Sequence, residues 1–153
     1  TLENDTVEKS GHYYVTVDSI QAHNSGDTAN VTTTKTVYLD ENVVPKLVSS
    51  VVPSVTSDTL EVKLTFDDAV TSGKNVDFEL YVNGKATGEK INALADTITK
   101  REELLVVKWA EAHPYDRVAD LLTADSIKLV ATETIDITDN NGNLTNVKEI
   151  VVK

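Results

Sequence analysis

The sequence of 153 residues contains no cysteine and no methionine, and it has a single tryptophan. Without cysteine there are no disulfides, no thiolate nucleophiles and no sulfur-ligated zinc or iron. Basic residues are also scarce, since 14 Lys and Arg face 25 Asp and Glu and give a formal charge of -11. No basic stripe is present to release counterions from phosphates, so we expect no nucleic-acid partner and no anionic membrane surface.

Long apolar runs are absent as well. No run approaches the roughly 18 residues of a membrane-spanning helix, and no charged-then-apolar leader precedes Thr1, so we expect no membrane insertion. Because the chain starts at Thr1 rather than at a methionine, we expect a fragment or a processed product. Hydrophobic residues still make up 40% of the sequence, which is enough for one core of about 100–150 residues.

The pattern that is present is an alternation of apolar and polar residues with period two. It is clearest between Thr59 and Asp67, where every second residue is Leu, Val or Phe, as in a strand with one buried face. Asn83-Gly84 tolerates positive φ and predicts a type I′ hairpin turn between two strands. The predicted strands are residues 13–18, 31–39, 59–67, 76–82, 85–91, 104–109, 127–131 and 147–152.

Helical patterns are few. Residues 114–122 begin with a proline suited to a first turn, and residues 93–103 suggest a second short helical turn. Many short strands separated by turn residues, with at most one or two short helices, indicate an all-β antiparallel sandwich.

Two segments share one plan. Residues 13–39 and residues 127–152 each contain an alternating strand, a polar loop with a glycine, and a second strand. The polar segment Asp40–Pro45 follows the first copy and ends in a proline, which stiffens the exit from a strand. We therefore expect residues 1–42 to be the last strands of one module and residues 43–153 to be a complete module. An alternative, in which residues 1–42 add strands to the same sandwich, stays open.

The residues of this junction and its flanking strands resemble the ends of tandem Ig-like domains in bacterial cell-surface proteins, and surface-layer (S-layer) proteins of Gram-positive bacilli are the closest match. The resemblance implies an Ig-like sandwich, a location outside the cell, a structural role, self-assembly and calcium dependence. Residues 93–122 are longer and less strand-like than a minimal module of that family. The similar segments are Tyr14–Val17, Asn24–Gly26, Thr32–Leu39, Asp40–Ser49, Leu60–Thr71 and Asp136–Asn143.

Catalytic constellations are thin. The histidines His12, His23 and His113 are far apart, the sequence has no Gly-x-Ser-x-Gly motif, and its six glycines form no phosphate loop. We therefore expect no enzyme, while a glycosidase with two converging carboxylates stays as a third hypothesis. The second hypothesis is a carbohydrate- or receptor-binding adhesin module that uses aromatic side chains for stacking. Its candidates are Trp109, Tyr81 and Tyr115, although core packing is the other interpretation of Trp109.

Calcium is the one cofactor that the excess of oxygen ligands favours. Asp136, Asp139 and Asn141 lie in a loop with a glycine, but the loop fails as an EF-hand, because Ile137 takes the first position and Lys148 the twelfth. A plain hairpin turn is the other interpretation. The junction residues Asp40, Glu41 and Asn42 form a second candidate calcium site, or else a soluble linker.

Together these features predict a spacer and self-assembly element of a secreted or surface-displayed protein. Its expected partners are neighbouring modules of the same protein, copies of itself, and a cell-wall or surface glycan. The acidic surface keeps copies apart until divalent ions or neighbouring subunits neutralise the repulsion.

Overall fold

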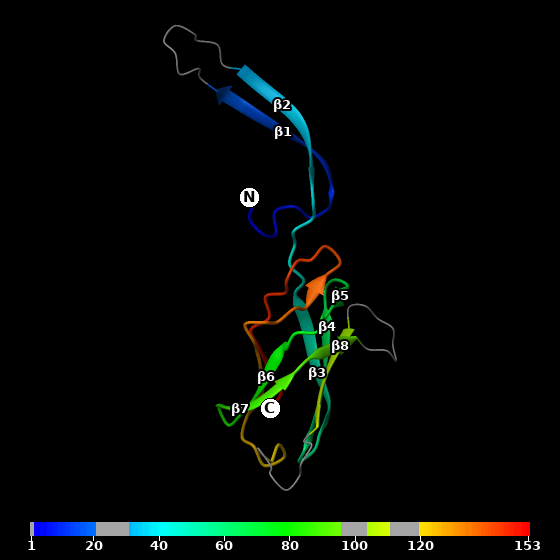
Figure 1. Cartoon of the computed structure of the whole chain (residues 1–153), viewed down its shortest axis with the longest axis vertical. Coiled ribbons are helices and arrows are strands. Elements are labelled where there is room, and N and C mark those ends of the chain that lie inside the picture. The colour runs from blue at the N-terminus through cyan, green and yellow to red at the C-terminus, as the bar shows by residue number, and fades with distance from the viewer. Residues whose placement is uncertain (1, 21–30, 96–103, 111–119) are drawn as a thin grey trace. The chain divides into compact units, whose positions relative to one another are not determined.

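The computed structural model describes residues 2–20, 31–95, 104–110 and 120–153 (Figure 1). The chain divides into two compact units, Thr1–Val43 and Val44–Lys153, one residue beyond the predicted junction. Every strand pair is antiparallel, and no described residue is helical. The all-β class predicted from period-two alternation is therefore confirmed.

The second unit is a sandwich of two four-stranded sheets. One sheet has the order β3-β4-β9-β8 and the other β12-β10-β6-β7, while β5 and β11 form a small separate pair. With that small pair set aside, the orders are A-B-E-D and G-F-C-C′, as in an immunoglobulin-like sandwich with one added strand. The strands are β3 (Leu47–Val55), β4 (Thr59–Phe66), β5 (Val70–Thr71), β6 (Phe78–Val82), β7 (Lys85–Ile91), β8 (Ala93–Ala95), β9 (Leu104–Ala110), β10 (Ile127–Ala131), β11 (Thr138–Asp139) and β12 (Glu149–Val151).

The core lies between the two sheets. In β4 burial alternates strictly, so that Leu60, Val62, Leu64 and Phe66 point inward while the residues between them are half-buried. In the facing sheet β6 repeats the pattern. Each such side chain contributes about 1.5–3 kcal/mol when it leaves water. The largest fully buried apolar side chains, which fill the centre, are Leu60, Val62, Leu64, Phe78, Leu80, Leu105, Val107, Leu121, Ile127, Leu129 and Ile137.

The Asn83-Gly84 turn between β6 and β7 is confirmed. Asn83 has φ 50° and Gly84 has φ 75°, the paired positive values of a type I′ turn. The amide oxygen Oδ1 of Asn83 also accepts hydrogen bonds from the backbone N–H groups of Asp125 and Ser126, at 2.7 and 3.1 Å. The turn residue therefore holds the segment that leads into β10.

The two short helical segments predicted from the sequence are not seen as helices in the described residues. Residues 93–95 form strand β8, so a helical turn beginning there is wrong: Ala93, Leu94 and Ala95 pair with Val107, Val106 and Leu105 of β9. Edge pairing therefore outweighed the local helical preference of alanine and leucine. The rest of that segment, residues 96–103, lies outside the described residues. So does most of the predicted helix 114–122, and its last residues, 120–122, are not helical.

Hydrogen bonds tie down both ends of the sandwich. At one end, where the unit begins, the Thr145 hydroxyl donates to the Pro45 carbonyl at 2.9 Å. At the other end, beyond the last residue of β3, the Leu121 N–H donates to the Ser57 carbonyl at 3.3 Å. There the ammonium group of the last residue, Lys153, donates to the Leu122 carbonyl at 2.9 Å. The unit therefore begins at one end of the sandwich and finishes at the opposite end.

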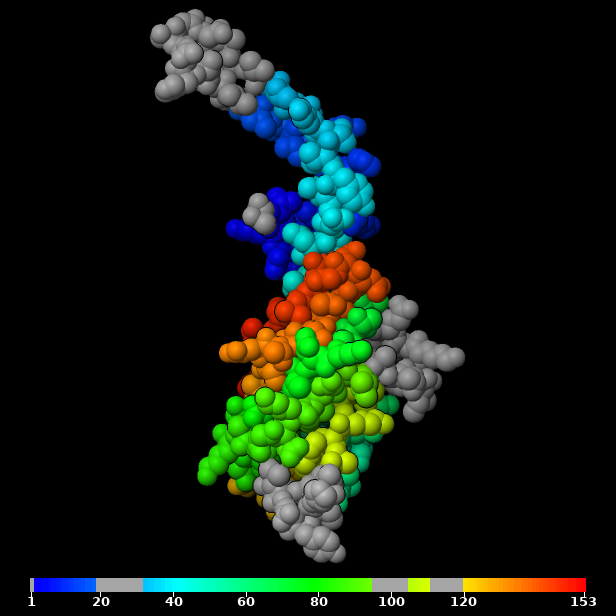
Figure 2. All heavy atoms as spheres, in the orientation of Figure 1, coloured from blue at the N-terminus to red at the C-terminus, as the bar shows by residue number. Residues whose placement is uncertain are grey.

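In its described residues, the first unit contains one hairpin, formed by β1 (Gly11–Ile20) and β2 (Val31–Leu39). Its strands pair in continuous register from Gly11 opposite Leu39 to Val17 opposite Thr33. The strands are blue and cyan in Figure 2, and most of their described side chains are exposed. Tyr14, for example, is 82% exposed. The hairpin thus presents a two-stranded sheet with apolar residues at its surface.

Candidate functional site

Among the described residues, the most deeply buried polar side chain is that of Asp77, which immediately precedes β6 and is fully buried. Its Oδ2 accepts hydrogen bonds from the Ser72 hydroxyl at 2.7 Å and from the Ala93 N–H at 2.8 Å. Its Oδ1 accepts one from the Asp136 N–H at 3.1 Å. Because Ala93 begins β8 in the opposite sheet, Asp77 connects the two layers of the sandwich.

Asp136, a predicted calcium candidate, continues this cluster. Its Oδ1 accepts a hydrogen bond from the Gly73 N–H at 2.9 Å, and its Oδ2 accepts one from the Asn75 N–H at 3.0 Å. Desolvation acts to raise the pKa of Asp136. The backbone hydrogen bonds, mainly from Asn75 and Gly73, outweigh it and hold the pKa below the ordinary value of 3.8. This carboxylate therefore acts as an anionic acceptor for the loop between β5 and β6.

Gly73 is required by this contact. A Cβ atom at that position would lie 3.0 Å from Cγ of Asp136 and closer still to its Oδ2. The loop backbone approaches the carboxylate so closely that only glycine fits without displacing it. We refer to Ser72, Gly73, Asn75, Asp77 and Asp136 as the carboxylate clasp.

Asp139, another predicted calcium candidate, fixes its own loop. Its Oδ1 accepts hydrogen bonds from the N–H groups of Asn141 and Asn143, both at 2.8 Å. Its Oδ2 accepts one from the side-chain amide of Asn143 at 2.8 Å. Gly142 follows with φ 86°, a value that glycine adopts without strain. This is the geometry of a turn capped by an aspartate, as the turn interpretation of the loop predicted.

The junction candidates lie in the first unit. The Asn42 amide oxygen accepts hydrogen bonds from the N–H groups of Thr6 and Val7, at 3.0 and 2.7 Å. Its amide nitrogen donates to the Glu3 carbonyl at 2.7 Å. Glu41 accepts a hydrogen bond from the Val43 N–H, and the side chain of Asp40 is exposed. Asn42 therefore fastens the start of the chain to the end of β2.

These contacts bear on calcium chemistry. Each oxygen of Asp136 and Asp139 already accepts a hydrogen bond from an N–H group of its own unit. A calcium ion would need further oxygen ligands beside these carboxylates to reach the six to eight that it prefers. Among the described residues, no three His, Cys, Asp or Glu side chains converge into a group that could hold a metal ion. The calcium site remains a prediction.

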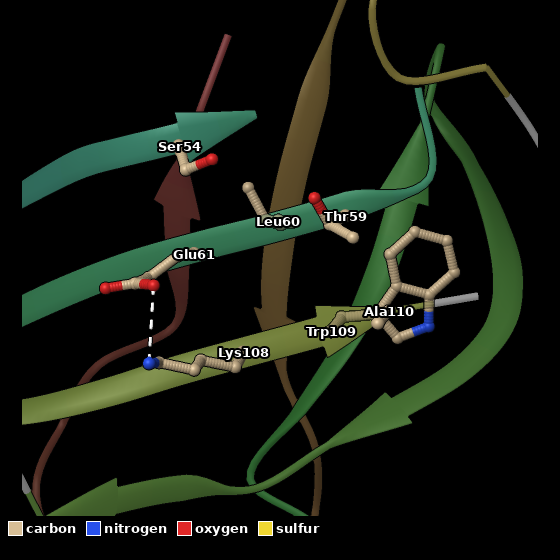
Figure 3. A pocket seen from close by; sticks show the side chains of 7 residues that line it. All are labelled: Ser54, Thr59, Leu60, Glu61, Lys108, Trp109 and Ala110. Atoms are coloured by element: carbon tan, nitrogen blue, oxygen red, sulfur yellow. Dashed lines mark ion pairs between the residues drawn. The ribbon is translucent and has the colours of Figure 1, made fainter. Parts of the chain in front are cut away.

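A shallow pocket of about 320 Å³ opens at the end of the β3-β4-β9 sheet, and Figure 3 shows its lining. Lys108 and Glu61 form an ion pair across it, with Nζ and Oε2 3.4 Å apart. Ser54 and Thr59 contribute hydroxyl groups, and Trp109 lies along one wall. The lining combines hydroxyls, one ion pair and one indole, a set that suits a small polar ligand.

The aromatic candidates separate in the structure. Trp109 is only 8% exposed and belongs to the core, as the packing interpretation predicted. Its indole N–H donates to a carboxylate oxygen of Glu89 at 3.1 Å. Tyr81 is half-buried on the opposite face of β6 from Phe78 and Leu80. Tyr115 lies outside the described residues. Of the three aromatic residues proposed as a stacking platform, the structure therefore describes only Trp109 and Tyr81.

Of the histidines, only His12 is described, and its ring meets Tyr38 edge-to-face with centroids 5.2 Å apart. His23 and His113 lie outside the described residues.

The sequence patterns did not point to Asp77. The signal that could have found it is a polar residue directly before the buried strand Phe78–Val82, a place where a charge survives only if hydrogen bonds satisfy it.

No protein-family model, curated protein or solved structure matches the chain. The described part of the chain contains no helical segment that could span a lipid bilayer.

Proposed function

We propose that this chain is a structural module of a bacterial cell-surface protein of the S-layer type, acting outside the cell as a spacer and self-assembly element without enzymatic activity. The observation that carries the proposal is the use to which the sandwich puts its polar groups. Asp77, Asp136 and Asp139 each accept hydrogen bonds from the backbone of the same unit. In many other proteins such carboxylates act as catalytic groups or metal ligands. In this sandwich they hold loops against strands.

The sheet architecture supports a load-bearing role. Two four-stranded sheets enclose a continuous apolar core, and the carboxylate clasp joins the loops at one end of it. The unit begins at one end of the sandwich and finishes at the other. Neighbouring modules joined to its two ends would therefore be held apart by the length of the sandwich. A rigid body with this path is suited to act as a spacer.

The net negative charge of the chain would make its self-assembly depend on salt and divalent ions. The formal charge of -11 makes copies of the chain repel each other at low ionic strength. Screening at physiological ionic strength limits this repulsion to about 8 Å, so close contacts become accessible when salt or divalent ions are present. The partners proposed are neighbouring modules and further copies of the same chain.

The experiment is a sedimentation series on the full chain at rising protein concentration, with sodium chloride or calcium chloride. We expect self-association that strengthens as the negative charge is neutralised. A chain that stays monomeric under every condition would overturn the assembly role. A reproducible ester, glycoside or peptide hydrolysis that is lost in a single Asp→Ala variant would overturn the non-enzymatic assignment.

The second candidate function is glycan or receptor binding, and the pocket lined by Glu61, Lys108 and Trp109 is the observation that favours it. Sugar hydroxyls would exchange hydrogen bonds with the ion pair and with Ser54 and Thr59. A glycan array on the wild-type chain and on Lys108→Ala tests it, since Lys108 is exposed and its removal leaves the core intact. Binding that is lost in Lys108→Ala but kept in Lys128→Ala would support this function.

A further inference from the structure

The edges of the two units are built in different ways. In the sandwich, edge strand β3 contains Pro53 and two shifts of register. Edge strand β7 contains Gly88 with φ 83° and the cations Lys85 and Lys90. The edge strands β8 and β12 have only three residues each. Proline, bulges, lysine and short length are the devices that keep a sheet edge from pairing with another chain.

Strand β1 has only one of these devices, a register shift between Val17 and Ile20 at its end. It runs for ten residues without proline or lysine, and its pairing with β2 shows no register shift from Gly11 to Val17. Among the described strands, only β2 pairs with it, so its other edge is not covered by a third strand. The second strand is protected in part, because Lys35 lies near its middle. In the described part of the chain, the stretch of β1 from Gly11 to Val17 is therefore the longest edge without proline, lysine or a register shift.

The sequence of β1 is complementary to itself. In an antiparallel pair centred on Val15, Tyr13 of one copy lies opposite Val17 of the other, and Tyr14 lies opposite Thr16. Aromatic and β-branched side chains are favourable cross-strand neighbours. In the same register His12 lies opposite Asp18, so that the only acidic group of the strand faces an imidazole. No like charges meet.

The distribution of charge also favours the β1–β2 hairpin as the contact surface. The two strands of the hairpin contain one aspartate, Asp18, and one lysine, Lys35, so their formal charges cancel, whereas the whole chain carries -11. Contact between two copies at this hairpin therefore meets less repulsion than contact at the acidic remainder of the surface. The exposed side chains available for burial there are Tyr13, Tyr14, Val15, Val17 and Tyr38.

We propose that two copies of this chain dimerise by antiparallel pairing of their β1 strands about Val15, which forms a continuous four-stranded sheet in the order β2-β1-β1-β2. An isolated two-stranded hairpin is marginal in water, and sheets of three or more strands with an apolar face become stable. The dimer would give this hairpin as many strands as each sheet of the sandwich has. The proposal rests on the assembly role argued above and identifies its contact surface.

The absence of cysteine makes the test direct, because an introduced thiol is the only one in the chain. Across an antiparallel pair, Cα atoms of opposite residues lie about 4.5 or 5.5 Å apart. Both distances fall in the range that a disulfide spans. We expect Val15→Cys to form a covalent dimer under mild oxidation, and Val48→Cys, on exposed strand β3, to form little. Equal cross-linking at both positions, or faster cross-linking at Thr34→Cys on β2, would overturn the proposed surface.

A charge exchange provides the second measurement. Val15→Lys and Val15→Glu each place like charges opposite one another, so each variant alone should self-associate about tenfold more weakly than wild type. An equimolar mixture should regain the association as a mixed dimer in sedimentation. Trp109 fluorescence verifies that the sandwich is folded in every variant, since the only tryptophan lies there.

The outcomes separate the two proposals. Wild-type association that is unchanged in Val15→Lys means that this edge is not the surface, while the assembly role stands. A wild-type chain that is monomeric throughout the series removes both. Variants that lose association singly without regaining it when mixed also overturn the β1 pairing, because a complementary pair must restore a direct contact.

Discussion

Replacing Asp77 by alanine tests whether the carboxylate clasp holds the two sheets together. The variant leaves three donors without their acceptor: the Ala93 N–H, the Asp136 N–H and the Ser72 hydroxyl. Ala93 is fully buried, so water cannot replace the lost acceptor there. A buried donor without a partner costs about 1–3 kcal/mol.

The three losses differ in size. We assign about 2 kcal/mol to the Ala93 N–H and about 1 kcal/mol to the half-buried Asp136 N–H. The Ser72 hydroxyl loses less, because it can turn to Oδ1 of Asp136, 3.5 Å away. The total is about 3–4 kcal/mol of unfolding free energy. For a unit the size of Val44–Lys153, this corresponds to a fall in Tm of about 12–16 °C.

Urea unfolding followed by Trp109 fluorescence measures this loss in the sandwich alone. Asp125→Ala is the matched control, because that aspartate is exposed and its removal should change the unfolding free energy by less than about 0.5 kcal/mol. Asp77→Asn should fall between the two, since an amide keeps one acceptor oxygen but turns an NH₂ group toward the donors on the other side. If Asp77→Ala and Asp125→Ala unfold at the same urea concentration, the clasp does not stabilise the sandwich.

Further predictions concern loops and ions. Because the pKa of Asp136 is lower in the folded chain than its ordinary value of 3.8, its stabilisation is complete above that value and is lost as the pH falls through the folded pKa. Urea titrations between about pH 5 and pH 2 should therefore show a flatter pH dependence for Asp136→Asn than for wild type. Gly73→Ala should cost about 1–3 kcal/mol by crowding that carboxylate, and a double-mutant cycle with Asp136→Ala should recover most of the loss; additive losses would contradict the contact. Asn83→Ala should cost about 1–2 kcal/mol in urea unfolding, through loss of the turn and of two hydrogen bonds, and an effect no larger than that of Asp125→Ala would refute the role of the turn. If calcium binds the folded chain, millimolar calcium must raise the melting midpoint above that in chelator, and Asp139→Asn should reduce the rise; identical curves would remove the calcium site.

Most of the longer strands followed from the sequence because their signals are local. The alternation of Leu60 to Phe66 reflects one buried face, and Asn83-Gly84 supplies the two positive φ values of its turn. Each of these features depends on residues close together in the chain, which is why a single sequence sufficed to predict them.

The carboxylate clasp did not follow, because its parts are distant in sequence. Asp77 and Asp136 are joined by a hydrogen bond across 59 residues, and the Ala93 N–H approaches from the other sheet. One sequence alone cannot distinguish a carboxylate that accepts backbone hydrogen bonds from one that binds calcium, since both lie in polar loops beside glycine. The strand at Ala93 was missed for a related reason, because its pairing with β9 is tertiary and overrides local preference.

The path of the chain through the sandwich determines how the unit responds to tension. Its first strand, β3, pairs with β4, and its last, β12, pairs with β10, each by antiparallel hydrogen bonds. Since the unit begins and finishes at opposite ends, a force applied between Val44 and Lys153 pulls both terminal strands along their own axes. The rungs of each ladder then share the load in shear instead of opening one after another. Such a body resists stretching far better than it resists peeling.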